Sequence, residues 1–217
     1  MGPYIGNCLK SIIDQDYPDI GIIVCDDMST DNTADVINEY VEVAAETERD
    51  VIFTKNDKKL YPAGNIYESA MNHIGDDSVM GIVDGDDYLC KSYAVSRMMK
   101  EYDNEDVWMA WSQHRLASGG TDTGSNVAGL SKPLPDDNTI QTRQYWSVSH
   151  FRTNRKFLFN HLNRADLLDY KNAEQYSPVC GDAAYLYPLV EMCGRERTSF
   201  ISEVLYHYRD DLSTNEH

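Results

Sequence analysis

The stretch Val79-Met80-Gly81-Ile82-Val83-Asp84-Gly85-Asp86-Asp87-Tyr88 changes abruptly from apolar to acidic residues. Its first five residues have almost no polarity, which is typical of a buried strand in a parallel sheet. Ligands of open α/β sheets bind at the carboxyl ends of strands, so we expect Asp84, Asp86 and Asp87 at the mouth of a cleft. A divalent cation between these carboxylates would relieve their repulsion. A plain turn with Asp caps is the alternative interpretation.

The same change of character occurs earlier in the chain. The apolar stretch 20–25 ends at Asp26 and Asp27, and a third short strand is expected at residues 51–53. The order strand, helix, strand, helix, strand favours a parallel sheet with right-handed crossovers. We therefore expect two acidic clusters and one basic cluster to meet at one edge of the sheet. The basic cluster consists of Lys55, Lys58 and Lys59.

Other segments carry weaker signals. Residues 2–7 are expected to form a loop, and residues 117–138 lack apolar periodicity, which is typical of a lid or a surface insertion. Tyr145 and Trp146 follow that segment and could stack on the ring of a ligand, although aromatic residues there more often pack in a core. Asp182 stands before an expected helix, where it is either an N-cap or a functional carboxylate.

Composition limits the classes of partner. The chain of 217 residues has 36 acidic against 19 basic residues and a net charge of -17, which argues against nucleic acid as a partner. The five cysteines are scattered without C-x-x-C spacing, so neither a zinc site nor a disulfide framework is expected. No apolar run approaches the length of a transmembrane segment and no secretory leader is evident, so a cytoplasmic protein is expected.

Several motifs follow one another in a fixed order. They are Cys8 to Ile13 with Gln15 and Tyr17, Ile22 to Val24 with Asp26-Asp27, Ser29-Thr30-Asp31 with Thr33, Ala63-x-Asn65, Asp84-x-Asp86-Asp87, Gly181-Asp182, and Tyr206-His207-Tyr208-Arg209 with Ser213. This ordered set covers nearly the whole chain and resembles the family 2 glycosyltransferases of the GT-A fold. The general character of the sequence also suggests a virus-encoded member, which no motif supports.

The resemblance implies a fold and an organisation. The fold is α/β and GT-A-like, with a mostly parallel nucleotide-binding sheet flanked by helices and a smaller acceptor-side region. Residues 1–217 are expected to form a single glycosyltransferase domain. Within it, residues 1–103 would form the half that binds the nucleotide sugar and metal, and residues 104–217 the acceptor and catalytic half.

On the donor side, the resemblance implies a nucleoside diphosphate sugar, expected to be UDP-linked. Asp26 or Asp27 would contact the uracil or ribose, and Asp84 would face the ribose or the metal. Asp86 would hold a manganese or magnesium ion that bridges the diphosphate, and His207 would complete the metal shell. A cation at this place stabilises the charge of the leaving group.

On the acceptor side, the resemblance implies that Asp182 is the general base for a hydroxyl of a glycan or glycoconjugate. A carboxylate opposite the leaving group can take the proton of the attacking hydroxyl, and in-line displacement then inverts the anomeric carbon. A retaining transferase, or a non-catalytic carbohydrate-binding or scaffolding module on the same fold, are the alternatives. A dehydrogenase would need G-x-G-x-x-G, which is absent from the sequence.

One departure from the family pattern concerns the phosphate contacts. The family usually has an arginine before the position of Asn65, where this chain has Gly64. The contact could therefore have moved to the lysines after the third strand, of which Lys55 comes first. Arg209 is expected to bind carboxylate or phosphate, with a surface ion pair as the competing interpretation.

Overall fold

The structure is a computed structural model that describes residues 1–117, 131–136, 140, 143 and 148–210. Most of the segment 117–138, together with Tyr145, Trp146 and Ser213, lies outside these residues. The predictions of a lid and of sugar-stacking aromatics therefore stay predictions.

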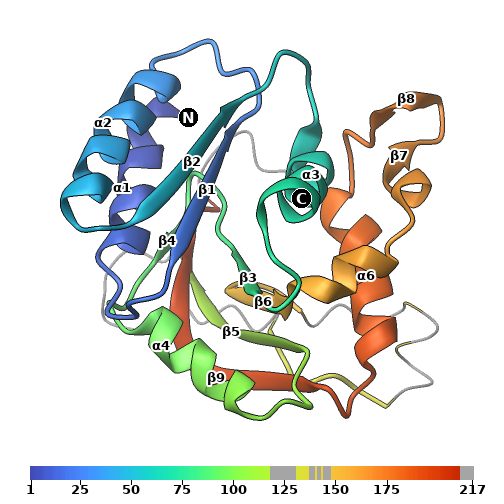
Figure 1. Cartoon of the computed structure of the whole chain (residues 1–217). Coiled ribbons are helices and arrows are strands. Elements are labelled where there is room, and N and C mark those ends of the chain that lie inside the picture. Colours follow the sequence, from blue (N-terminus) through green and yellow to red (C-terminus); the bar gives the residue numbers. More distant parts are fainter. Residues whose placement is uncertain (118–130, 137–139, 141–142, 144–147, 211–217) are drawn as a thin grey trace.

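The first part of the chain alternates helices and strands. Its elements are α1 (Gly2–Ile13), β1 (Gly21–Asp26), α2 (Thr33–Glu46), β2 (Asp50–Lys55) and α3 (Tyr61–His73). The strands β1 and β2 pair in parallel, with Gly21 opposite Asp50 and Asp26 opposite Lys55. Figure 1 shows α1 and α2 on one side of this pair and α3 on the other side.

A five-stranded sheet forms the centre of the molecule. Its strands are, in spatial order, β3 (Val79–Ile82), β6 (Arg152–Arg155), β5 (Met109–Leu116), β9 (Thr198–Tyr208) and β4 (Tyr88–Leu89). In this sheet β5 and β9 run parallel, and the other neighbours are antiparallel. The remaining elements are α4 (Ala94–Met99), the 3-10 helices η1 (Lys100–Asp103), η3 (Lys156–His161) and η4 (Arg164–Leu167), the hairpin of β7 (Leu168–Asp169) and β8 (Asn172–Tyr176), and α6 (Gly181–Cys193).

The α/β class is confirmed, and two local expectations differ from the structure. The expected loop at residues 2–7 is wrong, because α1 begins at Gly2. Proline is tolerated in the first turn of a helix, where its missing N–H has no partner to lose. Ile5 and Leu9, one turn apart, are buried on the same face of α1. The strand β3 pairs antiparallel with β6 instead of extending a parallel sheet, because the order of elements does not specify which strands bond.

The pairing of the strands brings distant segments together. Ile82 on β3 lies opposite Arg152 on β6, and Arg152 lies opposite the fully buried Trp111 on β5. At the opposite edge of the sheet, Tyr88 on β4 pairs with His207 on β9. The turn after β3, the residues before β6 and the end of β9 are therefore neighbours.

The helix α6 lies beyond α3, next to the β7–β8 hairpin (Figure 1). Its buried residues, which include Tyr185, Leu186 and Leu189, belong to the hydrophobic core that also holds Trp111. Within the described part of the chain, no helix has both the length and the apolar character needed to cross a membrane.

Candidate active site

The turn that follows β3 is held by the end of β9. The hydroxyl of Tyr206 donates a hydrogen bond of 2.7 Å to Oδ2 of Asp87 and accepts one of 3.1 Å from the backbone N–H of Asp84. The backbone N–H of Arg209 donates to Oδ1 of Asp87 at 2.7 Å. Asp87 is 1% exposed and Tyr206 is fully buried, so this turn is fixed from within the core.

Three side chains at this turn could hold a metal ion together. Asp84, Asp87 and His150 each offer one ligand atom, and these atoms all lie within 4.8 Å of one another. Nε2 of His150 lies 3.2 Å from Oδ2 of Asp84. The imidazole stacks on Tyr206 and on Tyr208, with ring centroids 4.8 and 5.1 Å away. Carboxylate and imidazole are ligand types that manganese accepts, so the donor set fits such an ion.

The charges of the turn favour a cation. Burial and the charges of Asp84 and Asp86 raise the pKa of Asp87 to about 8. Burial and the charge of Asp84 also raise the pKa of Asp86. Both shifts mean that the ionised carboxylates lack enough positive charge around them, which a bound divalent ion would supply. The electrostatics of the turn therefore fit a bound metal ion.

Asp84 itself is held ionised. Burial opposes the charge, but the hydrogen bond and charge of His150, together with the charge of Arg152, lower the pKa of Asp84 to about 2. Its side chain remains 42% exposed, so a ligand can reach it from solvent. Asp84 is therefore an ionised and accessible carboxylate at neutral pH.

The structure places the other predicted residues of this region around the same turn. Asp86 belongs to the turn but not to the group of three, and its carbonyl oxygen accepts a hydrogen bond of 3.2 Å from Nε of Arg209. The guanidinium of Arg209 lies 4.6 Å from the centre of the Tyr4 ring. His207 stacks on Tyr88 with the ring centroids 4.4 Å apart. The proposed metal roles of Asp86 and His207 stay predictions.

Asp182 lies in the first turn of α6 and contacts the central sheet. Nη2 of Arg152 lies 2.9 Å from Oδ2 of Asp182. The Arg152 side chain is 3% exposed, whereas that of Asp182 is 40% exposed. Burial opposes the charge of Arg152, but Tyr185, Asp182 and Asp84 together raise its pKa above the usual range. One buried cation thus lies close to both Asp182 and Asp84.

Asp27 belongs to a second set of contacts, at the ends of β1 and β2. Its carboxylate accepts hydrogen bonds from Asn56 Nδ2 and from the backbone N–H groups of Leu60 and Tyr61, at 2.8, 2.8 and 3.0 Å. Burial opposes its charge, yet these bonds lower the pKa of Asp27. Oδ1 of Asn65 accepts from the same Asn56 amide at 2.7 Å. Asp27 therefore fixes the start of α3 and places Asn65 beside it.

Asp26 is more buried than its neighbour Asp27 and accepts fewer hydrogen bonds. It is 2% exposed, and its Oδ1 accepts a hydrogen bond of 2.8 Å from the backbone N–H of Ser29. Its Oδ2 is buried without a hydrogen-bond partner among the described residues. A buried acceptor left unpaired costs about 1–3 kcal/mol, so a ligand donor at this place would be favourable. Lys55 is exposed and lies opposite Asp26 in the β1–β2 register, and Lys59 Nζ donates to the carbonyl oxygen of Asp27.

Packing leaves little room for a side chain at Gly64, where the sequence resemblance implies an arginine. A Cβ atom at this position would lie 2.4 Å from Cδ2 of the Tyr176 ring. The ring is anchored, because its hydroxyl accepts a hydrogen bond of 2.9 Å from Arg164 and donates one to Glu68. The β7–β8 hairpin thus occupies the space that a side chain at position 64 would need.

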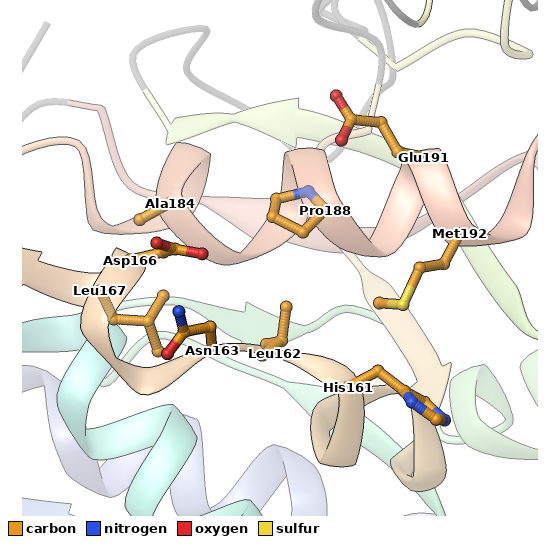
Figure 2. A pocket seen from close by; sticks show the side chains of 9 residues that line it. All are labelled: His161, Leu162, Asn163, Asp166, Leu167, Ala184, Pro188, Glu191 and Met192. Carbon is orange, nitrogen blue, oxygen red and sulfur yellow. The ribbon is translucent and has the colours of Figure 1, made fainter.

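A groove of about 310 Å³ lies on another face of α6 (Figure 2). It runs between α6 and the segment that holds η3 and η4, and none of the predicted site residues lines it. We do not place the active site there, because it lacks the carboxylates of the β3 turn. Its lining residues are His161, Leu162, Asn163, Asp166, Leu167, Ala184, Pro188, Glu191 and Met192.

Sequence reasoning missed two contributors to the site, because His150 and Arg152 were not singled out. Asp87 was expected at the cleft together with Asp84 and Asp86 but was given no role of its own. His150 lies two residues before Arg152, the first residue of β6, and both are buried although polar. The run of polar residues at 152–156, between Phe151 and Phe157, is the one local signal that could have identified them.

The chain matches the family described as "Glycosyl transferase family 2" over residues 2–164. Among the solved structures that match is the mannosyltransferase PcManGT from Pyrobaculum calidifontis in complex with GDP-Man and Mn2+, with a TM-score of 0.65 and 14% sequence identity. The similarity covers 96% of this chain and 53% of that one, so the chain spans about half the length of PcManGT. At this identity the similarity shows the fold alone, which is the GT-A fold. No curated protein matches the chain.

Proposed function

The chain belongs to glycosyl transferase family 2, and from that premise we propose that it moves a sugar from a nucleoside diphosphate sugar to a hydroxyl of a glycan or glycoconjugate. The observation that carries the proposal is the group of Asp84, Asp87 and His150, whose ligand atoms lie within 4.8 Å of one another after β3. We propose UDP as the nucleotide, as the sequence resemblance implies. GDP is the alternative, because PcManGT is described in complex with GDP-Man.

The metal is proposed to be Mn²⁺ or Mg²⁺. Asp84 and Asp86 would hold it with His207, and Asp87 and His150 are further candidates from the geometry of the turn. When bound, such an ion offsets the charge that develops on the leaving nucleoside diphosphate. The support is the charge balance of the turn, in which burial and neighbouring carboxylates raise the pKa values of Asp86 and Asp87.

The nucleotide is proposed to lie along the carboxyl ends of β1, β2 and β3. The buried Oδ2 of Asp26 would accept a hydrogen bond from the nucleobase or from a ribose hydroxyl, since it lacks a partner among the described residues. Asp27 and Asn65 would line the same region through their shared contact with Asn56. Lys55 and Arg209 would contact the phosphates.

Asp182 is proposed to be the general base. Its side chain is 40% exposed, and a carboxylate of this kind can accept the proton of an acceptor hydroxyl. Attack from the face opposite the diphosphate would invert the anomeric carbon. In this proposal residues 1–217 form one domain. Residues 1–103 supply the metal-binding carboxylates and most of the donor site, and residues 104–217 supply the base, the acceptor site and the contacts of His150, His207 and Arg209.

The proposal is tested by measuring release of nucleoside diphosphate from UDP-sugars and GDP-mannose, with and without Mn²⁺ and with a set of methyl glycosides as acceptors. We expect Mn²⁺-dependent release from one donor class, stimulated by at least one acceptor. Binding of nucleotide sugars without release under any condition would instead identify a non-catalytic module. NMR analysis of the product's anomeric configuration would distinguish inversion from retention.

A further inference from the structure

Arg152 is buried at a place where an uncompensated charge would be costly. Its side chain is 3% exposed and stands on β6, which lies between β3 and β5 in the five-stranded sheet. Arginine is seldom buried to this degree unless it is paired, because removing a charge from water costs several kcal/mol. The partners of its guanidinium therefore explain why the residue is there.

The first partner is Asp182, the proposed general base. Nη2 of Arg152 lies 2.9 Å from Oδ2 of Asp182, and the guanidinium lies 6.0 Å from the centre of the Tyr185 ring. Asp182 and Tyr185 stand three residues apart in the first turns of α6, so both face the same side of the helix. Arg152 thus contacts one oxygen of the Asp182 carboxylate from the central sheet, with which α6 shares a hydrophobic core.

The second carboxylate near Arg152 is Asp84. In the β3–β6 register Arg152 lies opposite Ile82, two residues before Asp84, and its charge favours the ionised form of Asp84. His150, two residues before Arg152, contacts Asp84 directly. His150 precedes β6 and belongs to the metal group, and Arg152, the first residue of β6, contacts the base, so the start of this strand connects the two parts of the site.

We propose that Arg152 is a positioning residue of the transfer reaction: by binding Oδ2 of Asp182 it turns Oδ1 towards the acceptor hydroxyl, at a fixed place relative to Asp84. This inference rests on the proposed function. Arg152 acts through Asp182 and does not itself exchange a proton, because a guanidinium stays protonated. The contact is made by one nitrogen, Nη2, whose N–H groups are fixed in the plane of the guanidinium, whereas the ammonium of a lysine rotates on a flexible chain and would orient the carboxylate less well.

The same strand offers a matched control. Arg155 also stands on β6, but its Nε and Nη2 donate to the backbone carbonyl oxygens of Val107 and Tyr102, at 2.8 and 3.2 Å. Its guanidinium also lies 5.5 Å from the centre of the Tyr102 ring. These contacts hold neighbouring segments together and involve no carboxylate. Removal of Arg155 should therefore lower stability without a specific effect on the reaction.

The test is a double-mutant cycle on nucleoside diphosphate release, with Mn²⁺ and the UDP- or GDP-sugar that the unmodified chain turns over fastest. The variants are Arg152→Met, Arg152→Lys, Asp182→Asn, and each Arg152 change combined with Asp182→Asn. Arg155→Met is the control. Melting temperature and binding of UDP or GDP with Mn²⁺ are measured for each variant.

We expect Arg152→Met to lower kcat about 100-fold while KM for the donor changes less than threefold, and Arg152→Lys to recover at least tenfold. In the Asp182→Asn background the same changes should lower kcat less than threefold. Arg155→Met should lower the melting temperature and leave kcat within threefold. If Arg152→Met does not fold, the cycle with Arg152→Lys gives the same test.

Equal losses in both backgrounds, or an unchanged kcat, would overturn the role of Arg152 and leave the proposed function intact. Absence of nucleoside diphosphate release by the unmodified chain from every donor would overturn the proposed function, and the role of Arg152 with it.

Discussion

Nε2 of His150 lies 3.2 Å from Oδ2 of Asp84, although 66 residues separate them along the chain. The antiparallel pairing of β3 with β6 produces this contact, because it sets the residues before β6 beside the turn after β3. His150 is therefore part of the candidate metal group, whereas the histidine predicted from sequence was His207.

Replacement of His150 by phenylalanine tests which histidine matters. Phe can keep the stacking on Tyr206 and Tyr208 but offers no ligand atom. Loss of a metal ligand or of a group that orients one typically costs about 10–100-fold in metal affinity, and we expect a loss of this size in Mn²⁺ affinity measured by calorimetry. His161→Phe, an exposed position away from the turn, is the control. Unchanged affinity in His150→Phe would favour His207 as the histidine of the site.

Asp182→Asn should separate binding from turnover. Asparagine keeps the shape of the side chain but cannot accept a proton as a general base. We expect UDP or GDP binding within about threefold of the unmodified chain and turnover lower by about 10²–10⁴-fold, the contribution that positioned acid–base groups usually make. Asp166→Asn, at an exposed position of η4, serves as the control. Normal turnover of Asp182→Asn would remove this residue from the reaction.

His114 makes stability depend on pH. It is 1% exposed, and burial together with the nearby charge of His150 lowers the pKa of His114 to about 4, below its ordinary value of 6.5. In the unfolded chain, His114 takes up a proton as the pH falls through 6.5. In the folded chain, its imidazole stays neutral over the same range. The contribution of His114 is thus complete above pH 6.5 and is lost as the pH falls towards 4.

The free energy of unfolding should consequently fall more steeply from pH 7 to pH 5 in the unmodified chain than in His114→Gln, by about 1–2 kcal/mol. Urea titration at the two pH values measures this difference. His161→Gln should retain the pH dependence of the unmodified chain. Parallel pH curves for His114→Gln and the unmodified chain would show that His114 is not kept neutral by the fold.

Gly64→Ala tests the packing of the hairpin on α3. Alanine is favoured over glycine in a helix by about 1 kcal/mol, but here its Cβ would lie 2.4 Å from the Tyr176 ring. Overpacking of this kind typically costs about 1–3 kcal/mol, so we expect a net loss of stability in urea. Gly21→Ala, at the start of strand β1, controls for adding a methyl group without a clash, because nothing lies within 4 Å of the Cβ position there. A Gly64→Ala variant more stable than the unmodified chain would mean that the Tyr176 ring moves to make room for the methyl group.

Much of the fold follows from local patterns in the sequence. The apolar stretches at β1 and β3 each end at carboxylates, and the helices α2 and α3 lie between the strands in the expected order. The prediction of a loop at the start of α1 was wrong, because Gly2 and Pro3 are typical loop residues in isolation. The first turn of a helix tolerates both. Local patterns also do not encode which strands bond, so the partner of β3 could not be predicted.

The same limit applies to the candidate site. Asp84, Asp86 and Asp182 stand at ends of elements, where the change from apolar to polar residues marks them. His150 and Arg152 carry no such mark, because their importance depends on the pairing of β6 with β3. Asp87 was visible in the motif, but its anchoring by Tyr206 depends on a contact between residues 119 apart.

The most direct measurement is calorimetry of UDP and GDP binding, with and without Mn²⁺, to the unmodified chain and to Asp84→Ala and Asp86→Ala. If the turn after β3 holds a cation and the donor's phosphates, one nucleotide should bind only with Mn²⁺, and both variants should lose that binding while keeping their fold. Unchanged, Mn²⁺-dependent affinity in folded Asp84→Ala and Asp86→Ala would contradict the account.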